Sequence, residues 1–174
     1  MILIVSSSLN RESNSRILAE EALRVLTNQG HSSAVLDLRE FPLPLCDGGA
    51  AYAHPNVAAV NQKLSAADGI IIATAIYNFD ANAAVKNLIE LTGSAWENKV
   101  VGFLCAAGGM SSYMSIMSLA NSLMLDFRSV IVPRFVYAVG EAFENGRIVD
   151  PKVTSRVAEL AKETARLGEA LKAA

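Results

Sequence analysis

The first segment that could do chemistry is rich in serine and follows the apolar N-terminal run. Residues 6–16 read SSSLNRESNSR and hold five serines and two asparagines just before a helix start. Exposed amides at a helix N-terminus carry partial positive charge and attract anions. The hydroxyls of Ser8, Ser13 and Ser15 can donate further hydrogen bonds. The segment therefore predicts a phosphate site, and a polar turn with a serine cap is the alternative.

Two further segments offer groups suited to a flat ligand. Tyr77, Asn78 and Phe79 follow the most apolar run of the chain. Aromatic faces beside an amide suit a flat heterocycle, because the ring can pack while polar atoms read its edge. Gly108 and Gly109 allow positive φ angles and close approach of a ligand. The alternatives are aromatic side chains folded onto the core and a plain helix-entry turn.

Other chemistries lack their motifs. The sequence contains no GxxxxGK[ST], no GxGxxG and no GxSxG. Cys46 and Cys105 do not form a CxxC pair, and we interpret them as packed thiols in a reducing compartment. His31 and His54 have no metal-ligand neighbour pattern, so we interpret both as surface residues. We name no catalytic side chain and no metal site.

The elements that must position these segments alternate in type. Short continuous apolar runs occupy 1–5, 35–38, 70–74, 100–105 and 130–132. Runs without polar alternation are typical of parallel strands buried on both faces. Helical periodicity occupies 15–29, 57–67, 83–91, 113–125 and a last helix from Pro151, which Asp150 caps. This alternation predicts an α/β fold with a parallel sheet, whose ligands bind beyond the carboxyl ends of the strands.

Composition limits the class of protein. The chain has 174 residues, 52% of them apolar, and a formal net charge of −2. We expect one domain over residues 1–174, and the apolar content excludes intrinsic disorder. The charge provides no positive field for nucleic acid, so we expect no nucleic-acid partner. No apolar stretch approaches the roughly 18–20 residues that span a bilayer, so we expect no membrane span and a cytoplasmic protein.

Taken in order, the three segments resemble a known family over nearly the whole chain. Residues 7–15, SSLNRESNS, are similar to a first-loop pattern GSxRxxSxN, and Tyr77-Asn78 with Lys86-Asn87 match a pattern YNxxxxxxxKN. The glycine pair at 108–109 follows the fourth strand, as in the same family. The chain thus resembles the NADPH-dependent FMN reductases, which include quinone, azo-dye and chromate reductases.

The resemblance implies a fold and a cofactor site. The fold would be a flavodoxin-like three-layer sandwich with a five-stranded parallel sheet of order 2-1-3-4-5. Ser8 and Ser13 would bind the FMN phosphate, Tyr77 and Asn78 would lie along the isoalloxazine ring, and the glycine pair would approach its pyrimidine edge. The complete set of implied cofactor-binding residues is Ser8, Asn10, Ser13, Ser15, Ala75, Ile76, Tyr77, Asn78, Gly108 and Gly109.

The resemblance also implies an activity. NADPH or NADH would give a hydride to FMN, and a quinone, free flavin, azo compound or metal oxyanion would take the electrons. The family forms homodimers and homotetramers, so we expect a homo-oligomer. Two alternatives remain, a flavin-binding electron carrier and a non-catalytic scaffold that has lost tight FMN binding.

Several positions depart from the family pattern. Asn10 stands where the family has arginine, which removes a charge-assisted bond to phosphate worth about 1.5–3 kcal/mol. Arg11 and Arg16 are the nearby cations that could replace it. The other departures are Ser15 for asparagine, Ala75-Ile76 for Pro-Glu, and Asn82 for proline.

Overall fold

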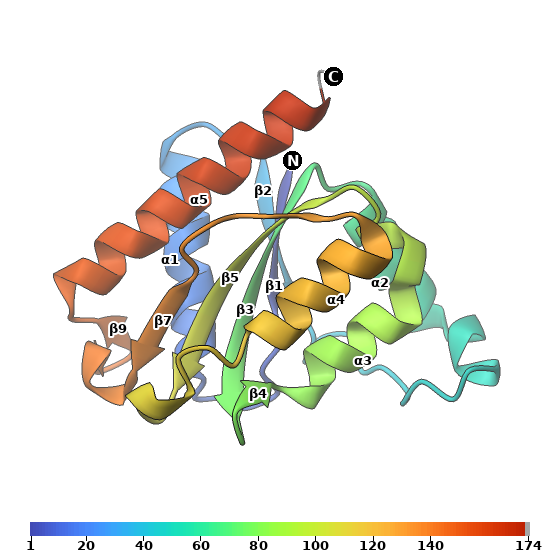
Figure 1. Cartoon of the computed structure of the whole chain (residues 1–174), viewed down its shortest axis with the longest axis horizontal. Helices are drawn as coiled ribbons and strands as arrows, with labels where there is room; N and C mark the ends of the chain where they lie inside the picture. The colour runs from blue at the N-terminus through green and yellow to red at the C-terminus, as the bar shows by residue number, and fades with distance from the viewer. Residues whose placement is uncertain (173–174) are drawn as a thin grey trace.

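The apolar runs form one parallel sheet in a computed structural model that describes residues 1–172 (Figure 1). Its main strands run in the order β2-β1-β3-β5, and two short strands, β6 and β7, both pair with β5 at the far edge. This arrangement confirms the predicted order 2-1-3-4-5. The strands are β1 (Ile2–Ser6), β2 (Ser33–Asp37), β3 (Gly69–Tyr77), β5 (Val100–Ala107), β6 (Val130–Ile131) and β7 (Val136–Val139).

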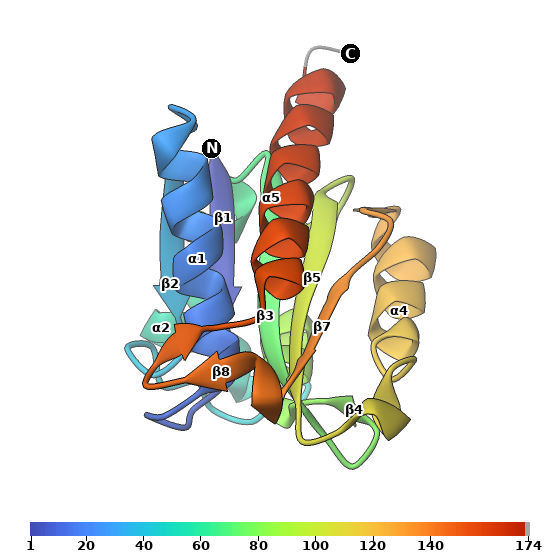
Figure 2. The ribbon, with the colours of Figure 1, turned by 90° about the vertical axis from the view of Figure 1, so that its left-hand side faces the viewer.

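Helices cover both faces of the sheet (Figures 1 and 2). Helices α1 (Asn14–Asn28) and α5 (Pro151–Lys172) bury their apolar faces on one side with Ile2, Ile4 and Ile71. On the other side, Leu3 and Val5 pack with α2 (Pro55–Ser65), α3 (Ala83–Thr92) and α4 (Met117–Phe127). Successive strand residues point to opposite faces, so a strand covered on both faces must be apolar throughout.

Helix ends follow the expected signals except in one case. The Asp150 carboxylate accepts a hydrogen bond from the Lys152 amide at 2.8 Å, which confirms the predicted cap of α5. The helix predicted over 113–125 begins only at Met117, so its predicted start is wrong. A 3₁₀ turn at Met110–Ser112 precedes it, and methionines at helical spacing continue across the turn and hide the boundary.

The remaining elements are short. Asn145 and Gly146 form the turn between β8 (Phe143–Glu144) and β9 (Arg147–Ile148), and both turn residues have positive φ. Among residues 1–172, no helix is long and apolar enough to cross a membrane. The short elements are β4 (Asp80–Ala81), β8 (Phe143–Glu144), β9 (Arg147–Ile148) and the 3₁₀ turns Ala50–Ala53, Gly93–Trp96 and Gly140–Ala142.

The far edge of the sheet is divided. One predicted strand at 130–132 is replaced by β6 and β7, which pair with opposite ends of β5. Pro133 lies between them and has no amide to donate to a ladder, and Arg134 has a φ of 61°. The chain therefore leaves the sheet and returns to it within four residues.

Gly102 lets α5 lie close to β5. A Cβ at Gly102 would stand 2.9 Å from Thr164 Oγ1 and 3.3 Å from Leu160 Cγ. Thr164 cannot easily turn aside, because it is β-branched and its hydroxyl donates to the Leu160 carbonyl at 2.8 Å.

Gly102→Ala is therefore expected to lower the free energy of unfolding by about 1–3 kcal/mol through overpacking. Urea denaturation followed by circular dichroism measures this change. Gly109→Ala is the matched control, because Gly109 is extended and its added Cβ would meet nothing within 4 Å. Equal stability of the two variants would contradict the packing argument.

Candidate functional site

The loops after β1, β3 and β5 enclose a cleft of about 610 Å³ at the carboxyl edge of the sheet. This is the edge where ligands of open α/β sheets bind. Eight of the ten residues implied by the family resemblance line the cleft, and Ser8 and Gly109 lie outside its lining. The eight are Asn10, Ser13, Ser15, Ala75, Ile76, Tyr77, Asn78 and Gly108; Glu12, Asn14, Ala106, Ala107 and Gly140 complete the wall.

The start of α1 offers hydrogen-bond donors to the cleft. Ser13 occupies the N-cap position with extended backbone, but no side chain in the described part of the chain caps the helix. The Ser13 hydroxyl instead shares a 2.8 Å hydrogen bond with the Ser15 hydroxyl. The Arg16 amide donates to the Ser13 carbonyl at 3.1 Å, so the amides of Asn14 and Ser15 keep their capacity to bind an anion.

The loop before α1 is folded upon itself. The Asn10 amide donates to Ser8 Oγ at 3.3 Å, and the Glu12 amide donates to Asn10 Oδ1 at 3.1 Å. Because the Ser8 hydroxyl oxygen serves as the acceptor here, its hydrogen stays free to donate. The Asn10 side chain stabilises the turn and supplies no charge to a phosphate.

Arg16 does not replace the missing arginine. Its Nη1 pairs with Asp37, and its Nε donates to Glu20 at 2.9 Å. Asp37 is nearly fully buried at the end of β2 and also accepts from Arg39 Nη2 at 2.6 Å. These ion pairs join β2 to α1 and neutralise the Arg16 charge.

The loop after β3 forms a tight hairpin with β4. Tyr77 pairs with Asp80, so the turn consists of Asn78 and Phe79 alone. Their φ angles are 49° and 66°, the pattern of a type I′ turn. Asparagine tolerates this conformation, whereas a left-handed phenylalanine costs about 1–2 kcal/mol. Strain of this kind gathers at functional sites, where it holds a particular shape.

Phe79→Gly is expected to raise the free energy of unfolding by about 0.5–1 kcal/mol, because glycine adopts positive φ without strain. Thermal denaturation measures this change. Tyr77→Gly is the control: Tyr77 is equally exposed but lies in β3, so this variant should be less stable.

The glycine pair after β5 shapes the third wall. Neither Gly108 nor Gly109 uses the positive φ that glycine allows. A Cβ on either residue would meet nothing beyond its chain neighbours within 4 Å, and Gly108 lines the cleft. The Gly109 carbonyl accepts the Tyr137 hydroxyl at 2.7 Å, which fixes the loop. The absence of a side chain thus leaves room for a ligand against the backbone.

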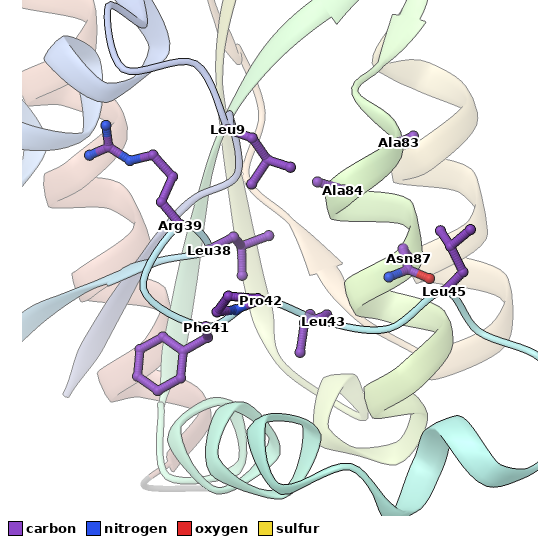
Figure 3. Close-up of a pocket in the computed structure, with 10 residues that line it drawn as sticks. All are labelled: Leu9, Leu38, Arg39, Phe41, Pro42, Leu43, Leu45, Ala83, Ala84 and Asn87. Atoms are coloured by element: carbon purple, nitrogen blue, oxygen red, sulfur yellow. The ribbon is translucent and has the colours of Figure 1, made fainter.

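An apolar groove of about 500 Å³ lies beside the cleft, and the sequence analysis did not predict it (Figure 3). Leu9 lines the groove and Asn10 lines the cleft, so one loop separates them. Arg39 turns away from the other lining side chains, and Asn87 is engaged by the Cys46 amide and the Pro44 carbonyl. The groove therefore offers apolar surface and no phosphate site. Its lining is Leu9, Leu38, Arg39, Phe41, Pro42, Leu43, Leu45, Ala83, Ala84 and Asn87.

The thiol nearest the cleft is not a reactive group. Cys105 is fully buried in β5, and burial raises the pKa of its thiol far above the usual range. This confirms its interpretation as a packing residue. Over residues 1–172, no group of three histidine, cysteine or acidic side chains could hold a metal ion.

The sheet order and the loops at its carboxyl edge define a flavodoxin-like protein with a cleft suited to an anionic group and a flat ring. A family model for the NADPH-dependent FMN reductases matches residues 1–144. The chain belongs to this family. FMN-dependent NAD(P)H oxidoreduction is accordingly its class of reaction, with FMN and NAD(P)H as cofactors.

Individual relatives agree with this assignment. The chain is 33% identical over 141 residues to an NAD(P)H-dependent FAD/FMN reductase of Geobacillus thermodenitrificans, covering 79% of this chain and 76% of the relative. It is 27% identical over 170 residues to an FMN-dependent NADH:quinone oxidoreductase of Haemophilus influenzae, covering 82% and 87%.

Solved structures share the fold. A flavoenzyme NAD(P)H:(acceptor) oxidoreductase from Paracoccus denitrificans superimposes with a TM-score of 0.78 at 18% identity, covering 97% of this chain and 96% of that one. An oxidoreductase from Corynebacterium diphtheriae superimposes with a TM-score of 0.76 at 22% identity, covering 95% of each chain.

Proposed function

We propose that this chain binds FMN in the cleft at the carboxyl edge and transfers electrons from NADPH or NADH to a small-molecule acceptor. The acceptor class comprises quinones, free flavins, azo compounds and metal oxyanions. One observation carries the proposal. The uncapped start of α1, the residues Tyr77 and Asn78, and the backbone of Gly108 line a single cleft.

The residues present fit FMN. When bound, FMN supplies the hydride-accepting chemistry. The hydroxyls of Ser13 and Ser15 and the first amides of α1 would hold its phosphate, together with the hydroxyl of Ser8, which belongs to the same loop but lies outside the cleft lining. Tyr77 and Asn78 would orient the ring, and Gly108 would admit it close to the backbone. No side chain of the cleft is needed as a general acid or base.

The purified protein is expected to retain FMN after addition and desalting, with absorbance bands at about 370 and 450 nm. The loaded protein should then oxidise NADPH or NADH steadily when an acceptor is present. Retained flavin without NAD(P)H oxidation would identify an electron carrier instead. Loss of all flavin on desalting, with no NAD(P)H oxidation in excess FMN, would contradict the proposal.

Asn10→Arg is expected to tighten FMN binding by about ten- to a hundredfold, because a charge-assisted bond to phosphate is restored. Titration of flavin fluorescence measures the dissociation constant. Asn28→Arg adds the same charge at the far end of α1 and should leave the constant within about twofold at 0.15 M salt, where charges are screened. An unchanged affinity in Asn10→Arg would place the phosphate elsewhere.

We also propose a homodimer or homotetramer. Apolar side chains are exposed along α4 and the turn before it, and such patches support subunit contact. Light scattering on the eluting protein measures the mass, and a monomer at micromolar concentration would contradict the proposal. The exposed residues are Met110, Met114, Met117, Met124 and Leu125.

A further inference from the structure

We infer that Asn82 is a positioning residue for the flavin, because its side chain ties the phosphate-binding loop to the ring-binding loop through Ser7. The inference rests on the proposed FMN site. Neither Asn82 nor Ser7 lines the cleft, so the pair acts through the loops that it joins. Asn82 follows the hairpin of Tyr77 and Asn78, and Ser7 directly precedes Ser8.

The bond is part of a buried network between the ends of β1 and β3. Asn82 Nδ2 donates to Ser7 Oγ at 3.1 Å. Ser7 in turn donates from its amide and its hydroxyl to the Ala73 carbonyl, at 3.0 and 3.1 Å. The Asn82 amide donates to the Ala75 carbonyl at 3.0 Å. Ser7 is fully buried and Asn82 is 5% exposed, so water does not compete for these bonds.

The side-chain carboxamide of Asn82 also caps the N-terminus of α3. Its Oδ1 accepts from the Val85 amide at 3.1 Å and caps the helix while Nδ2 reaches Ser7. The contact with Ser7 needs a donor and the helix cap needs an acceptor, and the asparagine side chain supplies both on one planar group. Serine at this position can cap the helix but is too short to reach Ser7, and aspartate has no donor. The cap and the tie between loops can therefore be separated by substitution.

The hydrogen bond between Asn82 and Ser7 affects the affinity for ligands that contact both loops. In the proposed site FMN would contact both loops, with its phosphate at the loop of Ser8 and Ser13 and its ring at Tyr77 and Asn78. A ligand that uses two contact regions binds more tightly when their spacing is fixed before it arrives, because the protein loses less conformational entropy on binding. Riboflavin lacks the phosphate and contacts only the ring loop. The tie should therefore raise the affinity for FMN more than the affinity for riboflavin.

The experiment is a double-mutant cycle of Ser7→Ala and Asn82→Ser in the full chain. The dissociation constants of FMN and riboflavin are measured by fluorescence titration for wild type, both single variants and the double variant. Each single variant is expected to lower the FMN-to-riboflavin affinity ratio about tenfold. The double variant should lose about as much as one single variant, because both changes remove the same bond.

His54→Ala is the control, since His54 Nδ1 accepts the Asn56 amide and caps α2 away from the flavin loops. It should cost stability and leave the affinity ratio unchanged. If the single variants weaken both ligands equally, or leave the ratio unchanged, the positioning role is overturned. Ser7→Ala keeps the cap of α3, so it decides the question alone if Asn82→Ser does not fold. A wild-type protein that does not prefer FMN to riboflavin would instead contradict the proposed phosphate site.

Discussion

Replacing Ser8 and Ser13 together with alanine is expected to weaken FMN binding by at least about a hundredfold. A hydrogen bond to a charged group is worth about 1.5–3 kcal/mol, so two lost bonds amount to about 3–6 kcal/mol. The effect is large because Asn10 carries no charge and Arg16 is engaged by Asp37 and Glu20, which leaves the hydroxyls, the amides and Arg11 to bind the phosphate. Isothermal titration with FMN measures the change.

The fold should survive this double substitution, because Ser13 does not cap α1 through its side chain. Ser65→Ala with Ser122→Ala is the matched control, since it removes two exposed helix hydroxyls that do not line the cleft. Wild-type FMN affinity in the Ser8 and Ser13 variant would show that this loop does not bind the phosphate.

Trp96→Ala is expected to lower the free energy of unfolding by about 3–5 kcal/mol, as truncation of a large buried aromatic residue does. Trp96 is fully buried among α2, α3 and α4. Its Nε1 donates to Thr92 Oγ1 at 2.9 Å, and Thr92 Oγ1 donates to the Leu88 carbonyl at 2.6 Å. Truncation leaves a cavity and removes the Nε1 group that donates a hydrogen bond to Thr92 Oγ1.

Guanidinium denaturation followed by circular dichroism measures this loss, because Trp96 is the single tryptophan of the chain and fluorescence would vanish with it. Trp96→Phe keeps a buried six-membered ring, and it loses the Nε1 donor with the smaller part of the ring volume. It should therefore cost less than half as much. Equal losses in the two variants would show that the hydrogen bond, and not the packing, stabilises this region.

The fold could be predicted because its signals are local. Strands buried on both faces are continuous apolar runs, and the Asp150-Pro151 pair marks the start of α5. The division of the last strand was not predictable from apolar runs alone. Val136–Val139 is short and follows Pro133, so its place beside β5 depends on tertiary pairing.

The candidate site was predicted by segment rather than by geometry. The hairpin at Asn78-Phe79 was missed because its turn lacks the glycine that usually marks a type I′ turn. The bond between Asn82 and Ser7 joins residues 75 positions apart, and the ion pair of Arg16 with Asp37 depends on the register of β1 and β2. Such contacts exist only once the sheet has formed.

The divided edge at β6 and β7 has a consequence for self-association. A long, straight edge strand exposes a row of unpaired amides and carbonyls that recruits strands from other molecules and seeds aggregates. Here Pro133 and the left-handed Arg134 interrupt that row after two residues. An incoming strand finds no continuous template along this edge, so the edge beside β5 should add further strands poorly even when the protein is concentrated.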